Sequence, residues 1–590
     1  MNKKSQTESP GLHNTRKRYA AERSKRSESD RRYVRLSSIS WARSKDHVNR
    51  APCTDAVDVT IIGAGIGGLV LGALLRQTGS VQRIRLVDEA PEVGGTWAVN
   101  DFPGLECDVE SFIYLPLLEQ TGTVPDYKYV SGENILDHCK SVARRFRLYD
   151  DALLSTRVTA AEWNCADRVW NIKTDAGDSF TSRFVCSAIG SLSIPKMPDI
   201  PGIESFMGHS FHANRWDYDY TGGTGGRELS NLTNKTVAVI GTGATAVQVI
   251  PKIADAAQRL LVIQRTPAVV LPKPNPATDE RWYESLPSGW QSERRDNFHR
   301  VTSGGTVHND LVDDGWTTIA APLAASLLRS AVDGDRTDAE VLDLRTMEKI
   351  RDGIDIAVDD PKTADALKPY YRLFCKRPTF HSSYYETFNR ANTELIDTSG
   401  RGVDRIDARG PVVNGTVHPV DCIIYATGFE SELTTPYTAR AGIEFTGRDG
   451  RRLSDWWADG VRTFHGVISH GFPNLFFMAK SQSGLHVNVP HMLEAVAEHI
   501  SFMVEEAVAN DALVEPTQRA ESAWVQEIST SAPRDLEFAQ SCTPGLFNNE
   551  GDPERSPRQN SSYGKGSIAF LELLEHWRNS GDKSDVGLSN

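Results

Sequence analysis

No run of apolar residues in this 590-residue chain approaches the roughly 18 residues that a membrane-spanning helix needs. The first residues, Met1 to Gln6, are basic, but no apolar stretch of the kind found in signal peptides follows them. Hydrophobic residues make up 39% of the chain and charged residues 24%, which is ordinary for a globular protein. We therefore expect no transmembrane segment and a cytoplasmic location.

Cysteine is also scarce, and its spacing excludes several classes of protein. The eight cysteines include no Cys-x-x-Cys pair. A scaffold of disulfides, a zinc site and a thiol-disulfide reductase all depend on paired or closely spaced cysteines. We therefore expect reduced thiols and no metal site.

Nucleic-acid binding has little support in the charge pattern. The net charge is −13, although the first 50 residues hold 14 Lys and Arg against 5 Asp and Glu. A basic segment can contact nucleic acid or membrane, but here it lacks interleaved aromatic residues and a strong amphipathic pattern. We interpret residues 1–54 as a basic arm with a short helix that packs partly on the body, and expect no nucleic-acid partner.

The first sign of chemistry is a glycine-rich turn after a short apolar strand, Asp58 to Ile62. Gly63 permits a tight turn, Gly65 lets backbone approach a pyrophosphate, and Gly68 lets helix and strand pack closely. A helical pattern and a second strand follow, and Asp88 then stands where a ribose hydroxyl is held. This order predicts a dinucleotide-binding fold with the phosphates at the helix N-terminus.

A second module repeats this order. Gly241, Gly243 and Ala246 follow the strand Thr236 to Ile240, and a helical pattern leads to a further strand. That strand ends at Arg265, where an acid would hold the 2′-hydroxyl of NAD. A cation suits a 2′-phosphate, so the sequence favours NADPH over NADH, with a surface arginine of no function as the alternative.

The segment between the two turns is a linker with distinctive side chains. Phe206, Gly208, His212, Trp216 and Asp217 stand at fixed offsets in it, which suggests a joint whose side chains matter more than its length. With the flanking turns, these positions resemble the fingerprint of type I Baeyer-Villiger monooxygenases. The resemblance covers nearly everything from about residue 19 to 577.

Other segments match the same family in order. Val93 to Trp97 resembles its flavin-binding continuation, and Lys376-Arg377 resembles its Lys-Arg-Pro motif. The tail around Thr543 to Gly551 and the arm around Tyr19 resemble the cyclopentadecanone monooxygenase branch and related fungal terpenoid, meroterpenoid and polyketide oxygenases. The chain departs from the family at Ala98 to Asp101, where two aromatic residues and an arginine are missing.

The resemblance implies two cofactors, FAD and NADPH. The residues implied to bind FAD are Gly63, Gly65, Gly68, Asp88, Gly95, Thr96, Trp97 and Asp108. Those implied to bind NADPH are Gly241, Gly243, Ala246, Arg265, Thr266 and Lys376. Phe206, Gly208, His212, Trp216 and Asp217 are assigned to a hinge and to communication between domains.

The resemblance also implies the reaction. NADPH reduces FAD, the reduced flavin takes up O2, and the activated oxygen attacks a ketone to give an ester or lactone. Negative charge then develops in a site from which water is excluded, so a cation that cannot lose its proton is needed. Arg377 matches the catalytic arginine of the family, and Asp108 matches the carboxylate that orients it, with a structural ion pair as the alternative for Asp108.

Two other functions remain open at this point. A flavin monooxygenase that oxidises nitrogen or sulfur shares both glycine turns and a similar linker, but lacks the Trp-Asp ending and the Lys-Arg-Pro motif. A non-catalytic NADPH-binding redox sensor is favoured only by the altered segment at Ala98-Val99. The preferred partners are a bulky ketone and O2.

The expected fold class is α/β, with two Rossmann-like dinucleotide-binding domains and a mostly helical insertion, because one core rarely serves 590 residues. We expect an FAD-binding domain from residues 55–195 and 401–577, the latter including the C-terminal tail. An NADP-binding domain would take residues 196–270 and 371–400. The helical insertion would span residues 271–370, and residues 578–590 would form a disordered end.

Overall fold

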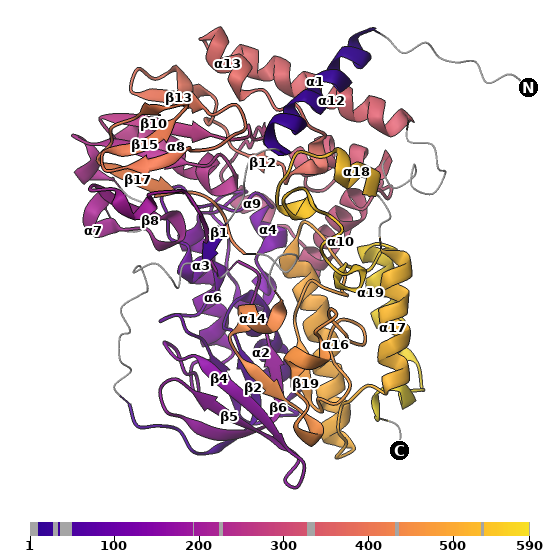
Figure 1. The fold of residues 1–590 in the computed structure, drawn as a ribbon. Helices are drawn as coiled ribbons and strands as arrows, with labels where there is room; N and C mark the ends of the chain where they lie inside the picture. The colour runs from indigo at the N-terminus through magenta and orange to yellow at the C-terminus, as the bar shows by residue number, and fades with distance from the viewer. Residues whose placement is uncertain are drawn as a thin grey trace, which may run out of the picture.

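The computed structural model describes residues 10–27, 33–35, 50–192, 194–223, 228–326, 337–430, 436–532 and 536–588. In these residues the chain forms two separate sheets with parallel strands at their centres, each followed by helices, as the two glycine-rich turns predict. Figure 1 shows the second sheet at upper left and the first sheet below it. Within the described ranges, no helix is both long and apolar enough to cross a membrane.

The first sheet has seven strands in the described residues, in the order β18-β4-β5-β6-β2-β3, with β19 paired to β6. Strands β2, β3, β6 and β19 run parallel, and β4, β5 and β6 form an antiparallel meander. The bounds are β2 Ala56–Ile62, β3 Ile84–Val87, β4 Val158–Asn164, β5 Val169–Thr174, β6 Ser179–Ser187, β18 Glu444–Thr446 and β19 Leu475–Phe477. Helix α2, Ile66–Thr78, follows β2 and packs against α16, Val489–Ala509. The apolar spacing after Gly65 thus forms a helix buried along most of its length.

The second sheet has the order β13-β10-β9-β17-β8, and its strands are parallel throughout. The bounds are β8 His209–His212, β9 Thr236–Ile240, β10 Arg259–Gln264, β13 Thr393–Asp397 and β17 Cys422–Tyr425. Helix α8, Ala244–Ala256, follows β9 and covers the sheet with its buried face. Strand β8, at one edge of this sheet, therefore belongs to the fingerprint segment, which we define as residues 206–217.

One predicted boundary is wrong. We placed the strand around Cys422 in the FAD-binding domain, but β17 lies between β8 and β9 of the second sheet. The chain returns to the first sheet only after Tyr425. An apolar run ending in Ala-Thr-Gly predicts a buried parallel strand and does not identify its sheet.

The region between β10 and β13 is mostly helical, as predicted. It contains α9 Glu280–Glu284, α10 Trp290–Thr302, the π-helical turn η5 Trp316–Ala320, α12 Thr337–Ala357 and α13 Pro361–Leu367. A short parallel pair, β11 Val270–Leu271 and β12 Thr379–Phe380, closes this region. Its buried side chains form one apolar cluster with Val109 and Ile113 of the first module. The insertion therefore packs beside Asp108.

The shorter elements complete both modules. The helices are α3 Thr96–Val99, α4 Ser111–Tyr114, α5 Leu118–Thr121, α6 Gly132–Arg145, α7 Tyr218–Thr221, α14 Tyr437–Ala441 and α15 Leu453–Trp456. The remaining strands are β14 Arg405–Asp407, β15 Gly410–Val413 and β16 Thr416–Val417. The 3-10 turns outside the tail are η2 Ile203–Ser205, η3 Ala213–Arg215, η4 Ser230–Leu232, η6 Leu373–Cys375, η7 Glu386–Asn389 and η8 Arg448–Gly450.

Both ends of the chain wrap around this body (Figure 1). Helix α1, Pro10–Ser27, lies near α12, and β1, Tyr33–Arg35, pairs antiparallel with β7, Lys196–Pro198. The C-terminal tail forms α17 Gln518–Ser531, α18 Leu536–Ser541, η9 Leu546–Gly551, η10 Arg558–Asn560 and α19 Ser567–Asn579. The basic arm thus packs on the body, as expected for the part that the structure describes.

Two expectations about the tail and the cysteines are wrong. The predicted disordered end is instead folded up to Leu588, because η11, Ser584–Val586, buries Val586 and Leu588. The Cys375 and Cys542 side chains form a disulfide with 5.1 Å between their Cα atoms. Residues 167 positions apart were not recognisable as a pair from spacing alone.

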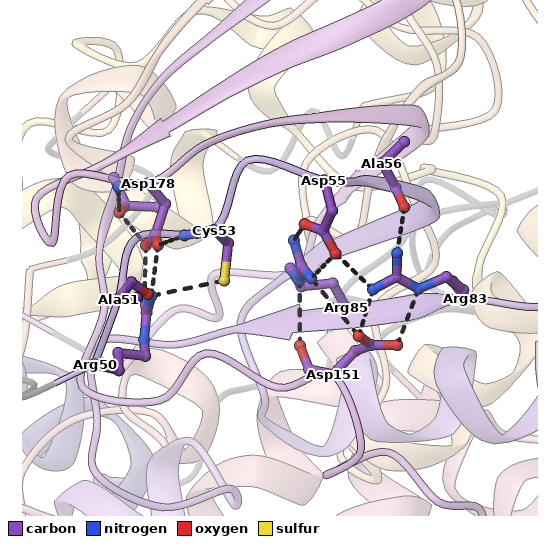
Figure 2. A network of polar contacts seen from close by, with 10 residues as sticks. Arg50, Ala51, Cys53, Asp55, Ala56, Arg83, Arg85, Asp151 and Asp178 are labelled. Atoms are coloured by element: carbon purple, nitrogen blue, oxygen red, sulfur yellow. Dashed lines mark hydrogen bonds and ion pairs between the residues drawn. The ribbon is translucent and has the colours of Figure 1, made fainter.

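Figure 2 shows two polar clusters near the N-terminal ends of β2 and β3. The glycine-rich turn follows the opposite, C-terminal end of β2. Arg83 Nη2 lies 2.6 Å from Asp55 and 2.7 Å from Asp151, and the buried Arg85 also donates to Asp55 at 2.9 Å. Hydrogen bonds from Arg85 hold the pKa of Asp55 below its usual range. In the neighbouring cluster Arg50 pairs with Asp178 at 2.5 Å. These clusters join strands and loops of the first sheet, and none of their charged residues lines the cavity described next.

Candidate active site

The first glycine-rich turn has no room for side chains at two positions. Gly63 has φ +108°, and a Cβ there would lie 2.3 Å from the carbonyl oxygen of Ala188. A Cβ on Gly68 would lie 2.0 Å from the carbonyl oxygen of Gly63, so helix α2 packs directly on the end of β2. Both glycines therefore have the roles predicted for the turn.

Gly65 faces a different surface. A Cβ on Gly65 would meet only Gly95, at 3.5 Å, whereas a Cβ on Gly95 would lie 2.7 Å from Gly65 Cα. The two backbones form a narrow cradle at the N-terminus of α2, where a pyrophosphate fits. Asp88 lies on the same cavity wall and is fixed there, because its carboxylate accepts the N–H groups of Ala64 at 2.6 Å and Ala90 at 2.8 Å.

The second turn has the same construction. Gly241 has φ +118°, and a Cβ there would lie 2.4 Å from the carbonyl oxygen of Ala426. Gly243, which precedes helix α8, would place a Cβ in open space. Thr242 donates its hydroxyl to the carbonyl of Thr266 at 2.6 Å, which holds the Arg265-Thr266 segment against the turn.

A single cavity of about 2710 Å³ joins the two turns. The predicted site residues on its walls are Gly63, Gly65, Asp88, Gly95, Thr96, Trp97, Asp108, Gly241, Gly243, Arg265, Thr266, Lys376 and Arg377. Gly68 and Ala246 do not line it and instead pack helices onto strands. Phe206, Gly208, His212, Trp216 and Asp217 do not line it either, in agreement with a role outside the cavity.

Arg377 and Asp108 form the main ion pair of the cavity wall. The arginine donates twice to the carboxylate, from Nη1 to Oδ2 at 2.5 Å and from Nη2 to Oδ1 at 2.6 Å. The indole of Trp316 donates to the Asp108 carbonyl at 2.8 Å and lies under the guanidinium, 5.4 Å away. Since 44% of the Arg377 side chain is open to the cavity while Asp108 is buried, the carboxylate orients a cation that faces the cavity.

The charge of Arg377 is secure. Burial alone would lower its pKa, but the charge of Asp108 and the two hydrogen bonds outweigh burial and raise the pKa above the usual value for arginine. A bidentate pair also restricts the guanidinium to one plane. The site therefore holds a permanent, oriented cation, which sequence analysis predicted at these two positions.

The fingerprint segment joins the two modules. Its Asn214 donates to the side chain of Asn100 at 2.7 Å, and the hydroxyl of Tyr218 donates to the carbonyl of Asp101 at 2.5 Å. Neither residue was predicted from the sequence, although each lies within two positions of a fingerprint residue. They contact the segment Ala98 to Asp101, where the chain departs from the family.

The predicted fingerprint residues stabilise this junction. His212 is buried, and its Nδ1 accepts the N–H of Asn214 at 3.1 Å. Burial lowers the pKa of His212 to about 4, so the ring is neutral at physiological pH. Asp217 accepts from Tyr220 N at 3.0 Å and contacts His209 at 2.8 Å, which fixes the turn after the strand. Gly208 has no room for a Cβ, which would lie 2.4 Å from the Phe206 ring.

Large apolar side chains are exposed on the cavity wall. Leu485 is 57% exposed, Phe547 51%, Leu546 45% and Leu192 41%, and all four line the cavity. Exposed large apolar residues that gather in one concavity mark a surface for an apolar ligand. Sequence analysis did not assign these residues to the site.

Known proteins resemble this chain in sequence and structure. An NAD(P)-binding Rossmann-like domain family matches residues 61–125. Neopentalenolactone D synthase of Streptomyces avermitilis is 50% identical over 97% of this chain and 98% of that protein. A Baeyer-Villiger monooxygenase of Streptomyces coelicolor is 46% identical over 91% of this chain and 89% of that protein. These similarities cover almost the whole chain.

Solved structures agree. A polycyclic ketone monooxygenase from Thermothelomyces thermophila has a TM-score of 0.90 with 34% identity and covers 98% of both chains. A steroid monooxygenase bound to NADP has a TM-score of 0.73 with 29% identity, over 90% of this chain and 100% of that one. These proteins support ketone oxidation, and neither nitrogen or sulfur oxidation nor a redox sensor.

Proposed function

The chain belongs to the Baeyer-Villiger monooxygenases, and from that premise we propose which ketone it oxidises and which residues carry out the reaction. Enzymes of this family use FAD and NADPH to insert one atom of O2 beside a ketone carbonyl. The product is an ester or a lactone. The residues of this chain must therefore bind two dinucleotides, exclude water and stabilise negative charge.

Both cofactors fit the residues present. The cradle between Gly65 and Gly95, with Asp88 at its edge, suits the pyrophosphate and ribose of FAD. The open space at Gly243 suits the pyrophosphate of NADPH, and Arg265 with Lys376 suits its 2′-phosphate. When bound, the flavin reduced by NADPH supplies the activated oxygen.

Arg377 is the proposed catalytic residue. Its guanidinium faces the cavity, cannot lose its proton and is oriented by Asp108, so it can stabilise the negative charge that develops on the carbonyl oxygen of the substrate. Asp108 is a positioning residue in this proposal. The bidentate pair on the wall of the shared cavity is the single observation that carries the assignment.

The proposed substrate is a bulky, largely apolar polycyclic ketone, with a lactone of the pentalenolactone group as the product. Support comes from the four exposed apolar side chains on the cavity wall, Leu192, Leu485, Leu546 and Phe547. The names of relatives that are 47–50% identical, pentalenolactone D synthase and neopentalenolactone D synthase, also favour it. Burial of such a ketone against these side chains would supply the binding free energy.

Mass spectrometry of products from a panel of ketones tests this proposal. We expect purified enzyme with NADPH and O2 to convert polycyclic terpenoid ketones to products heavier by one oxygen atom. Efficient turnover limited to ketones the size of cyclohexanone would overturn the substrate class while leaving the reaction type intact.

The fingerprint residues His212 and Asp217 are proposed to act at the junction of the two modules. The contacts of Asn214 and Tyr218 with Asn100 and Asp101 support this role, because movement of one module is then transmitted to the other. The proposed location is the cytoplasm, and fractionation of the producing cells tests it.

A further inference from the structure

An acid from the C-terminal tail lies among the cations proposed to hold the 2′-phosphate of NADPH. Glu550 accepts from Lys196 Nζ at 3.1 Å, and its second oxygen lies 3.7 Å from Arg265 Nη2. Arg265, Lys376 and Glu550 all line the cavity. Arg265 would therefore face both the Glu550 carboxylate and the 2′-phosphate, and the charge of Lys376 also acts on Glu550.

Glu550 is charged in this position. Burial alone would raise its pKa, but the charges of Lys196, Arg265 and Lys376 outweigh burial and lower the pKa below its usual value. Only 18% of the Glu550 side chain is exposed, so water screens these interactions weakly. The carboxylate therefore offsets part of the positive charge that an incoming phosphate would meet.

The backbone of the tail holds Glu550 in place. The Asn548 side chain accepts the N–H of Gly545 at 2.8 Å and the N–H of Gly551 at 3.2 Å, and it is buried. Asn549 and Glu550 both have positive φ, +50° and +57°, a backbone conformation that residues other than glycine rarely adopt. The turn η9 thus directs the carboxylate toward the cations at the cost of some backbone strain.

We propose that Glu550 competes with the 2′-phosphate of NADPH for Arg265 and Lys376, and so limits how tightly the enzyme holds NADPH and NADP+. This inference rests on the proposed NADPH site. NADH lacks the 2′-phosphate, so its binding does not depend on these cations and does not compete with Glu550. Glu550 is therefore a residue that reduces the preference of the enzyme for the phosphorylated cofactor.

Binding measurements with Glu550→Gln test this competition without use of catalytic activity. The dissociation constants of NADP+, NAD+ and adenosine 2′,5′-bisphosphate would be measured calorimetrically on the FAD-containing enzyme at fixed ionic strength. Loss of one neighbouring negative charge is expected to tighten NADP+ and the bisphosphate about fivefold to tenfold and to leave NAD+ unchanged. Glu550→Ala, which also removes the charge, should give the same shift if the glutamine variant fails to fold.

Glu554→Gln is the matched control, because Glu554 lies on the same tail and lines the same cavity but is exposed. It should leave all three constants unchanged. Equal tightening of NADP+ and NAD+ in Glu550→Gln would overturn the proposal, as would unchanged or weaker binding of NADP+. Arg265→Ala separates this failure from that of the NADPH site itself, since it must weaken NADP+ but not NAD+ if the site is correct.

Discussion

At the scale of single residues, we expect the replacement of Arg377 to have the largest effect on product formation. Replacing it with alanine removes the cation that pairs with Asp108 and leaves both glycine-rich turns intact. Loss of one preorganised charge at such a site typically slows the reaction by about a hundredfold to a thousandfold. We expect Arg377→Ala to retain FAD and NADPH, to oxidise NADPH slowly with release of hydrogen peroxide, and to form lactone at no more than about a hundredth of the wild-type rate.

Arg377→Lys is the informative comparison, because it keeps the charge but loses the bidentate contact with Asp108. It should recover only part of the activity. Product formation measured by mass spectrometry, beside NADPH consumption and peroxide release, separates the steps. Lactone formation at the wild-type rate in Arg377→Ala would mean that another group stabilises the charge.

Gly65 permits a second test at this scale. Alanine at this position has ordinary backbone angles, and its Cβ would meet protein atoms no closer than 3.5 Å. The variant should therefore fold normally, yet most of the FAD should be lost, because the Cβ occupies the approach of the pyrophosphate. The ratio of flavin to protein absorbance checks this, with Gly353→Ala in helix α12 as a control that should keep its FAD. A fully yellow Gly65→Ala enzyme would contradict the assignment of the first module.

At the scale of elements, the fingerprint segment and the segment Ala98 to Asp101 form a junction between the modules. The side-chain hydrogen bond from Asn214 to Asn100 is buried, so Asn214→Ala leaves a buried amide without this partner. We expect unfolding to require about 1–3 kcal/mol less, and a larger share of NADPH to be consumed without product. Denaturant unfolding and the ratio of lactone to NADPH consumed measure the two effects. An unchanged ratio would leave this contact with a purely structural role.

The disulfide between Cys375 and Cys542 connects the Lys376-Arg377 segment to the C-terminal tail. A crosslink between residues so far apart stabilises the folded state mainly by restricting the unfolded chain, typically by about 2–4 kcal/mol. The double variant Cys375→Ala/Cys542→Ala should lose stability of this order in denaturant unfolding. The exposed Cys165, changed to alanine, should not.

Peptide mapping without reductant shows directly whether this bond forms. We expect a crosslinked peptide that contains Cys375 and Cys542. Enzyme recovered with both cysteines free would contradict the disulfide, a bond that is rare in the cytoplasm.

At the scale of the whole molecule, buried and half-buried neutral histidines make stability depend on pH. Burial lowers the pKa of His212, His299 and His381 to about 4, and that of His465 and His491 to about 3. The unfolded chain then binds protons first as pH falls below about 6.5, the usual histidine value. Stability from these neutral rings is fully present above pH 7 and is lost as pH falls toward 4.

His212→Gln isolates one of these groups. Between pH 7 and pH 5 the free energy of unfolding of the wild type should fall by about 1–2 kcal/mol more than that of the variant, because only the wild type gains a proton at this position on unfolding. Denaturant midpoints at the two pH values measure this difference. Parallel pH dependences would show that the pKa of His212 is the same in the folded and the unfolded enzyme.

The sequence by itself determined the parts of this protein that depend on local interactions. A strand, a glycine-rich turn and a helix within about 20 residues specify a dinucleotide site, because turn geometry and helix packing act between neighbours in the chain. The same is true of Gly63 and Gly241, which have positive φ, and of Arg265 at the end of its strand. The resemblance to the family identified Arg377 and Asp108 as candidate site residues.

Only the tertiary structure decided which distant groups meet. Asp108 and Arg377 are 269 residues apart, and Lys196 and Glu550 are 354 apart, so no spacing predicts either pair. The first pair was expected only from the family resemblance, and the second was not expected at all. The strand at Cys422 has the same apolar pattern in either sheet, and its hydrogen-bonded neighbours alone place it in the second one. Charge pairing, strand order and the disulfide depend on contacts that form when the chain is folded, since the local pattern is identical for several partners.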